Sequence, residues 1–89
     1  MTFEYDNSAD VLYLTLEDRP PEQCRFVENK HGDVLRIDKN TGEIIGVTII
    51  SFLLRIKKGL EISVPEIGPI PFKKQAARIM KGEHSRAQK

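Results

Sequence analysis

Short runs of alternating apolar and polar side chains, separated by turn-forming residues, constrain this chain more than any other feature. In Val11–Leu16, three leucines share one face, and Val11, Tyr13 and Thr15 share the other. A period of two is the periodicity of a β-strand. Similar runs are Thr2–Tyr5, Cys24–Glu28, Val34–Asp38, Ile44–Ile50 and Leu60–Val64. The pattern predicts an antiparallel β-meander of five or six short strands.

The residues between these runs favour tight turns. Asp6–Asp10 consists mainly of turn formers, which predicts a β-hairpin between the first two strands. Asn40-Thr41-Gly42 fits a hairpin loop that has glycine in the left-handed conformation. Gly46 lies inside a strand pattern, so it predicts a bulge or the close approach of another backbone. The segment Ser51–Lys58 stays open between a helical turn and a bent extension of the strand.

The period of the pattern changes near the C-terminus. Pro65, Pro69 and Pro71 predict an extended linker that is not helical. An apolar helical stripe then follows at positions i, i+4, i+7 and i+8, which are Phe72, Ala76, Ile79 and Met80. Gly82 is well placed to end this helix. We therefore expect one α+β domain over residues 1–82, with the C-terminal helix packed on the sheet, and a disordered tail over residues 83–89.

Composition narrows the class of protein. A chain of 89 residues suits one small domain. Cys24 is the only cysteine, which excludes an internal disulfide and fits a reducing cytoplasm. The first six residues are acidic, unlike a signal peptide, and the longest apolar run, Ile44–Leu54, is too short and too interrupted to cross a bilayer. We expect a cytoplasmic protein without a membrane segment.

Charge is distributed unevenly along the chain. Residues 1–54 carry five Lys/Arg and ten Asp/Glu, a net charge of −5, whereas residues 55–89 carry nine and three, a net charge of +6. Such halves indicate a basic arm for an acidic partner, two halves that lie against each other, or head-to-tail pairing between chains. The sequence leaves these alternatives open.

Two stretches resemble a known family. The first comprises Tyr5-Asp6, Asp10, Leu12-Tyr13-Leu14 and Leu16, and the second comprises Asp38, Gly42 and Ile44-Ile45-Gly46-Val47. Together they resemble the domain-of-unknown-function family 2283 over about residues 3–54. The resemblance implies a small, mostly-β bacterial fold and no established catalysis. Some members are similar to proteins encoded beside small toxins, which implies an antitoxin-like role. The family pattern ends in an Ala-Ser pair where this chain has Ser51-Phe52, and the basic part from Leu60 onward lies outside it.

The acidic residues of the first hairpin allow two interpretations. Asp6 and Asp10, with Glu4 or Asp38, could bind a divalent cation through oxygen. Alternatively, Asp6 caps the turn by accepting backbone amides and Asp10 closes it. Acidic side chains are common in turns, so we favour the architectural interpretation.

The spacing of the other candidate residues does not match known metal-binding or catalytic motifs. A calcium loop that starts at Asp38 needs glycine sixth and glutamate twelfth, where this chain has Glu43 and Ile49. His31 and His84 lack a partner at ligand spacing, and Cys24 is most simply a small core residue. The chain has no glycine-rich phosphate loop, nucleophile elbow or Cys-x-x-Cys pair. We therefore expect no enzyme activity, no catalytic residues, no metal and no cofactor.

The candidate partner-binding residues lie in the predicted C-terminal helix. They are Lys73, Lys74, Arg78 and Lys81. These residues form either a solvated helix face or a binding surface for an acidic protein or for nucleic acid phosphates. We favour a non-enzymatic interaction module, antitoxin-like, that binds a small protein partner. The alternative is a nucleic-acid-binding accessory protein that uses the basic helix.

The apolar residues also predict a homodimer. The strands Val11–Leu16 and Ile44–Ile50 carry apolar side chains on both faces, unlike a sheet with one solvated face. A helix of about ten residues is only about 15 Å long and covers part of one face. Soluble monomers rarely leave a large apolar patch bare, so we expect a second copy to cover the other face.

Overall fold

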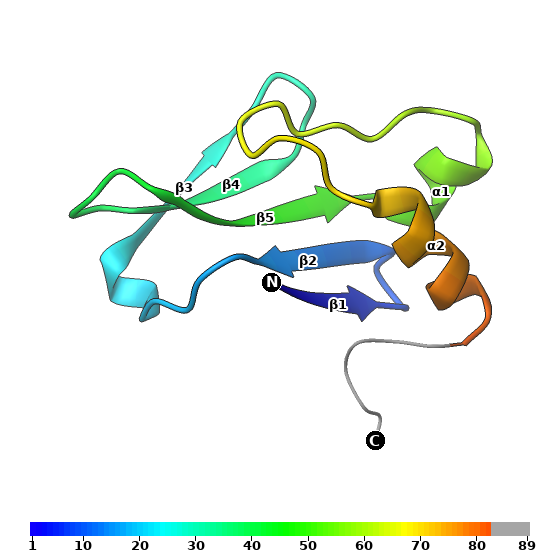
Figure 1. Cartoon of the computed structure of the whole chain (residues 1–89), viewed down its shortest axis with the longest axis horizontal. Coiled ribbons are helices and arrows are strands. Elements are labelled where there is room, and N and C mark those ends of the chain that lie inside the picture. The colour runs from blue at the N-terminus through cyan, green and yellow to red at the C-terminus, as the bar shows by residue number, and fades with distance from the viewer. Residues whose placement is uncertain (83–89) are drawn as a thin grey trace.

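The computed structural model describes residues 1–82; the predicted tail, residues 83–89, lies outside the described residues. The described chain forms an antiparallel sheet and three helical segments (Figure 1). The strands are β1 (Thr2–Asp6), β2 (Val11–Thr15), β3 (Cys24–Glu28), β4 (Val34–Asp38) and β5 (Ile44–Ile50). The helices are the 3-10 helix η1 (Pro21–Gln23), α1 (Phe52–Lys57) and α2 (Phe72–Met80). The first five predicted strands and the C-terminal helix are confirmed.

The strands lie in the order β1-β2-β5-β4-β3, and every neighbouring pair is antiparallel. The predicted α+β class is confirmed. The order departs from a sequential meander in one place, because the chain passes from β2 to the far edge of the sheet before it forms β3. Two further strands return it to β2, so that β5 lies in the centre. The most apolar strand is therefore hydrogen-bonded on both sides and has no exposed edge.

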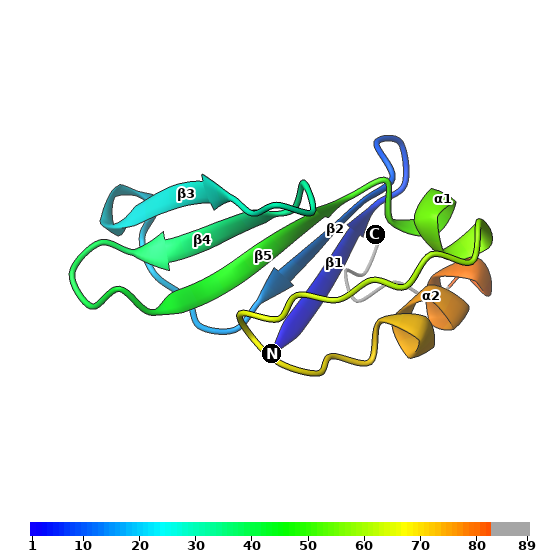
Figure 2. The same ribbon diagram turned by 90° about the horizontal axis from the view of Figure 1, so that it is seen from above.

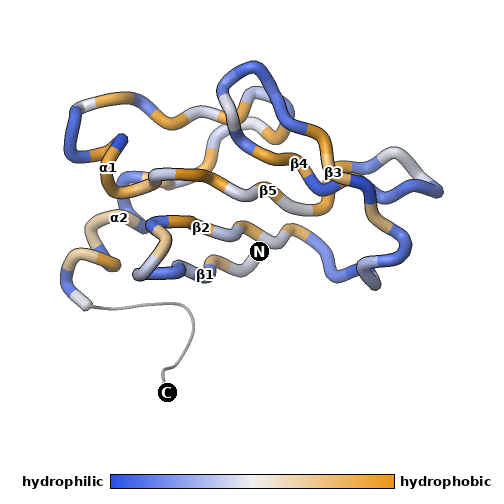
Figure 3. The backbone as a smooth tube through the Cα atoms, turned by 180° about the vertical axis from the view of Figure 1, so that it is seen from behind, coloured by the Kyte–Doolittle hydropathy of each residue, from blue (hydrophilic) through white to orange (hydrophobic). Residues whose placement is uncertain are grey.

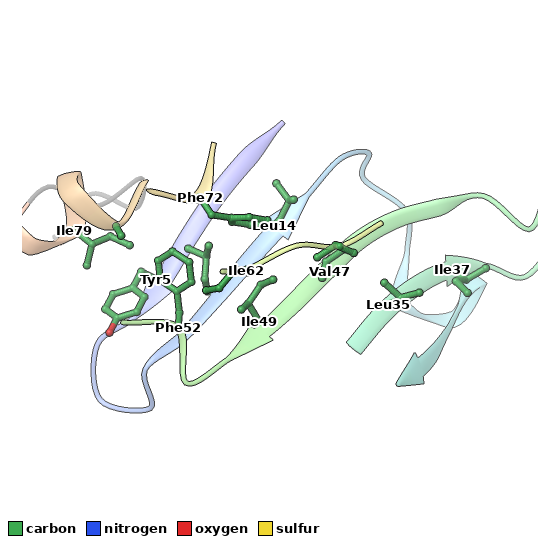
Figure 4. Packing of buried hydrophobic residues seen from close by; sticks show 13 residues of the cluster. Tyr5, Leu14, Leu35, Ile37, Val47, Ile49, Phe52, Ile62, Phe72 and Ile79 are labelled. Carbon is green, nitrogen blue, oxygen red and sulfur yellow. The ribbon is translucent and has the colours of Figure 1, made fainter. Parts of the chain in front are cut away.

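The core lies on one side of the sheet. Helices α1 and α2 and the connecting segment 60–71 cover this face (Figure 2). Apolar positions recur along β2, β4 and β5 (Figure 3). The buried cluster comprises Tyr5, Leu12, Leu14, Leu35, Ile37, Val47, Ile49, Phe52, Ile62, Val64, Phe72, Ala76 and Ile79 (Figure 4).

Phe52 connects the sheet to both helices. Its ring packs edge to face against Tyr5 of β1, with centroids 6.4 Å apart, and against Phe72 of α2, with centroids 6.2 Å apart (Figure 4). Aromatic pairs in this arrangement contribute about 0.5–1.5 kcal/mol beyond the burial of their area. The position of α1 therefore determines how the aromatic part of the core packs.

The predicted strand Leu60–Val64 is wrong. The segment pairs with no strand, although Ile62 and Val64 are buried against the sheet as the alternation requires. The chain turns at Pro65–Ile67 and returns alongside, but Pro69 and Pro71 have no N–H groups to donate to a ladder. The alternation here reflects one buried side of an extended segment and not a hydrogen-bonded strand.

The two α-helices answer two further questions from the sequence: the conformation of residues 51–58 and the apolar stripe of the C-terminal helix. Within Ser51–Lys58, which the sequence leaves open, Phe52–Lys57 forms α1, and Ser51 precedes it in the left-handed conformation with φ of 56°. In α2, the predicted stripe is correct for Phe72, Ala76 and Ile79 but wrong for Met80, which is 50% exposed. Met80 is the last residue of the helix, and the buried residues of the helix are Phe72, Ala76 and Ile79.

Gly46 combines the bulge and the close approach that its position predicts. The pairing of β4 with β5 shifts between Arg36 and Ile37, which leaves Ile45 as the extra residue of a β-bulge. A Cβ atom at Gly46 would lie 2.6 Å from Arg36 Nη2 and 2.9 Å from the carbonyl oxygen of Leu14. Arg36 is flexible and can shift, but the backbone of β2 cannot.

We predict that Gly46→Ala lowers the free energy of unfolding by about 1–3 kcal/mol, because overpacking of this order forces a backbone shift. Denaturant unfolding measures the change, and Thr48→Ala on the same strand is the control. A Gly46→Ala protein that is as stable as the wild type would show that β2 and β5 are not as close as described.

We predict that Ile79→Asp lowers the free energy of unfolding by at least about 2 kcal/mol, because a carboxylate replaces a buried apolar side chain. Met80→Asp introduces the same charge at the exposed neighbouring position and should change stability by less than about 0.5 kcal/mol. Equal effects of the two substitutions in thermal unfolding would mean that α2 is not docked through Ile79.

Candidate functional site

Asp10 of the first hairpin caps a helix that lies 43 residues further along the chain. Its Oδ1 atom accepts hydrogen bonds from the Tyr5 hydroxyl (2.7 Å) and the Leu53 amide (2.8 Å), and its Oδ2 atom accepts from the Leu54 amide (3.1 Å). Its carbonyl oxygen accepts from the Phe52 amide (3.0 Å). Ser51, the residue before α1, makes no side-chain cap. Asp10 therefore supplies the acceptors that the start of α1 lacks locally.

The same contacts set the protonation states of this pair. Burial alone would raise the pKa of Asp10, but the bonds from Tyr5, Leu53 and Leu54 and the charge of Lys57 together lower the pKa below its usual value. Burial raises the pKa of Tyr5, and the bond to Asp10 and the nearby carboxylate charges raise it further. Tyr5 is therefore held as a donor and Asp10 as an ionised acceptor, which is the strong form of such a bond.

Asp6 and Asp38 stabilise their own turns. Asp6 Oδ1 accepts from the Ser8 amide, the Ser8 hydroxyl and the Ala9 amide, at 2.8–3.2 Å. The architectural interpretation is therefore confirmed for Asp6, while Asp10 acts over a much longer range than turn closure. Asp38 is buried; Oδ1 accepts from the amides of the next turn and Oδ2 from Arg19 Nε at 3.0 Å. The bond from the amide of Asn40 is the main cause that lowers the pKa of Asp38.

A buried ion pair that the sequence analysis missed joins the turn before β4 to α1. Asp33 is fully buried, and its Oδ1 atom accepts from Arg55 Nη1 at 2.9 Å. The same nitrogen donates to the carbonyl oxygen of Ile50 at 3.2 Å. Asn29 Oδ1 accepts from the Asp33 amide and holds the turn in place. No spacing rule relates Asp33 to Arg55, so only the folded chain reveals the pair.

The cysteine and the histidine of the described chain do not form a reactive cluster. Cys24 is buried, and its Sγ atom donates to the carbonyl oxygen of Pro20 at 3.4 Å. His31 is exposed in the turn before β4, and His84 lies outside the described residues. Within residues 1–82, no group of three or more His, Cys, Asp and Glu side chains is arranged to hold a metal ion.

The predicted basic residues lie on the outer side of α2. Lys73, Lys74, Arg78 and Lys81 are all exposed, opposite the buried side of the helix. A hollow of about 310 Å³ lies at the start of the helix, between α1 and the segment 60–71. Its lining residues are Ile56, Glu61, Ile62, Ile70, Pro71, Phe72, Lys73 and Lys74. The structure thus brings two of the four basic residues to a hollow whose lining is partly apolar and partly charged.

We predict that Asp10→Ala lowers the free energy of unfolding by at least about 2 kcal/mol, because the helix loses its cap and the partly buried Tyr5 hydroxyl loses its bond to Asp10. Asp10→Asn should cost less, since asparagine keeps one acceptor oxygen and tolerates the left-handed conformation that Asp10 adopts, with φ of 56°. Denaturant unfolding compares the two. Calorimetry that detected calcium or magnesium binding in the wild type but not in Asp10→Ala would contradict this structural role.

We predict that stability falls as pH drops below about 4, the usual range of an unfolded aspartate. The folded-state pKa values of Asp10 and Asp38 are lowered, so the unfolded chain binds protons first and their contribution is present only above that range. Melting curves from pH 6 to pH 2.5 should fall less steeply for Asp10→Asn than for the wild type. Parallel curves would remove Asp10 from this pH dependence.

Comparison with known proteins agrees with the sequence motif. The family model described as a protein of unknown function (DUF2283) matches residues 2–52, which cover the sheet and the start of α1. No curated protein and no solved structure matches the chain. Within the described residues, no helix has the length and apolar character that a membrane crossing requires. The match covers more than half of the chain, and the chain belongs to the DUF2283 family.

Proposed function

We propose that the protein is a non-enzymatic interaction module that binds an acidic segment of a protein partner at its helical end. The observation that carries this proposal is the excess of positive charge in the helical layer, where Lys73 and Lys74 of α2 line a hollow together with Glu61. Between residues 52 and 82, two acidic residues, Glu61 and Glu66, stand against seven basic ones. The basic residues are Arg55, Lys57, Lys58, Lys73, Lys74, Arg78 and Lys81.

The placement of Lys73 and Lys74 supports a role outside folding. They lie in the first turn of α2, where the helix dipole favours acidic residues, and this turn contains no acidic residue. A lysine in this position costs stability, and no ion pair within residues 1–82 offsets that cost for either side chain. Departures from local stability rules are concentrated at functional sites.

The hollow favours a protein partner over nucleic acid. Its lining includes Ile56, Ile62 and Phe72, which match apolar side chains that flank carboxylates better than they match phosphates. The acidic first half of the chain would also repel a nucleic acid that extends past the helices. An antitoxin-like role, in which the module holds a small toxic protein, is the specific form of this proposal.

The test compares Lys73→Glu/Lys74→Glu with Lys30→Glu/Lys39→Glu, which makes the same charge change at exposed turns of the sheet. Tagged proteins are cross-linked in the native host, and the recovered partners are identified after nuclease treatment. We expect a protein, cross-linked to residues around the hollow, to be recovered with the wild type and the turn variant but not with the helix variant. The helix variant should melt at the same or a higher temperature, because glutamates suit the first turn of a helix.

The outcomes separate the two candidate functions. Recovery of RNA or DNA that salt releases, and that the helix variant does not bind, would replace the protein-binding proposal with the nucleic-acid alternative. Equal recovery of the same protein by both variants would remove the basic side of α2 from the site. Loss of binding together with unfolding of the helix variant would contradict the expected stability.

A further inference from the structure

The sheet face opposite the helices, here called the open face, carries apolar side chains that the described chain does not cover. Tyr13 of β2 is 41% exposed, Phe26 of β3 is 62% exposed and Ile50 of β5 is 43% exposed. The register places all three on this side, because Leu12, Leu14, Val27 and Ile49 next to them point into or against the core. Uncovered apolar side chains gathered on one sheet face mark an interaction surface.

Arg36 of β4 lies on the open face, and most of its donors have no partner among the described residues. Its guanidinium occupies the space over Gly46, and Nη2 donates to Thr15 Oγ1 at 3.1 Å. Its Nε atom is buried and has no partner among the described residues. A guanidinium carries five N–H donors, and the one bond to Thr15 uses only one of them. Arg36 can therefore still donate to an acceptor such as a carboxylate.

Glu28 supplies an unpaired carboxylate on the same face. The residue is exposed, and no hydrogen bond or ion pair joins its carboxylate to another described residue. Arg36 is directly opposite Phe26 on the neighbouring strand, and Glu28 is two residues further along that strand. Arg36 and Glu28 are therefore diagonal neighbours that remain apart within one chain.

We propose that the open face is a two-fold contact between two copies of this chain, in which Arg36 of each copy pairs with Glu28 of the partner subunit. On a pleated sheet, strands lie about 4.8 Å apart and residues of one face repeat about every 6.8 Å along a strand. Consider a two-fold axis that lies between the two stacked sheets and parallel to them, and that crosses the line from Arg36 to Glu28 at its midpoint and at a right angle. This axis places Arg36 of each copy over Glu28 of the partner subunit. A two-fold contact requires this reciprocity.

The same axis also matches the apolar residues. On this lattice it brings Tyr13 over Ile50 of the partner subunit, and it leaves Phe26 and Val34 each beside their own counterparts. One operation thus pairs the arginine with a carboxylate and covers the three exposed apolar side chains. Aromatic residues and arginine are also the types enriched at the energetic centres of interfaces.

Charge favours a second copy over nucleic acid on this face. By the register, Glu28 and Asp38 lie on the open face with Arg36, and Arg19 pairs with Asp38 there. A polyanion would meet the exposed carboxylate of Glu28 beside Arg36, whereas a second copy brings one arginine to one exposed glutamate at each end of the axis. The contact is independent of the basic side of α2, which belongs to the other layer.

The test is a charge exchange, followed by sedimentation equilibrium from about 1 to 500 µM, a range that covers the weak dimers expected of small interfaces. The wild type should approach twice the chain mass of 10.2 kDa. Glu28→Arg and Arg36→Glu each oppose like charges across the axis and should each be monomeric at concentrations where the wild type is a dimer. Glu66→Arg makes the same charge change on the helical side and should leave the dimer intact.

Restoration of pairing is the decisive readout. An equimolar mixture of Glu28→Arg and Arg36→Glu chains, and the double variant alone, should regain the dimer because opposite charges again face each other. Ile50→Lys tests the apolar part of the contact at an exposed position, so the proposal does not depend on Arg36→Glu folding. A monomeric wild type at every concentration, a dimer that persists in Glu28→Arg or Ile50→Lys, or the absence of restoration would each overturn the proposal.

Discussion

The bond network of Asp10 is the interaction on which the packing of the helical layer depends. Helix α1 contains six residues, far fewer than a helix needs to persist in water without tertiary contacts. Asp10 accepts its first amides and fixes where it begins, and this places Phe52 between Tyr5 and Phe72. The first hairpin thus positions an element formed by the middle of the chain. This explains how a carboxylate in the family motif can matter without taking part in chemistry.

Asp33 and Arg55 add a second tie to the same helix. Breaking a buried ion pair by removing one partner leaves an uncompensated charge, which costs about 3–5 kcal/mol. Asp10 holds the first turn of α1 to the β1–β2 hairpin, and Arg55 holds its middle to the turn that precedes β4. The hairpins at the two edges of the sheet are therefore joined through one short helix.

The sequence was sufficient to predict those strands and helices whose pattern lies within a short stretch of neighbouring residues. The bounds of the strands followed from period two and from turn residues such as Gly42, and α2 followed from the spacing of Phe72, Ala76 and Ile79. Helix α1 could not be assigned, because its cap comes from Asp10, 43 residues away. Leu60–Val64 was misassigned because period two reports one buried side and does not require a neighbouring strand. The Asp33–Arg55 pair and the open donors of Arg36 depend on strand order, which local pattern does not determine.

The two proposed surfaces lie on opposite sides of the sheet, and this arrangement has a consequence for binding. Phe26, Arg36 and Tyr13 belong to the open face, whereas Lys73 and Lys74 border the hollow of the helical layer. A dimer formed through the open face would leave both hollows uncovered and direct them away from each other. Each dimer would then hold two partner molecules, and a partner that is itself dimeric would bind more tightly by avidity only where its two sites can reach both hollows. Dimerisation and partner binding would be coupled through stoichiometry without any conformational change in either surface.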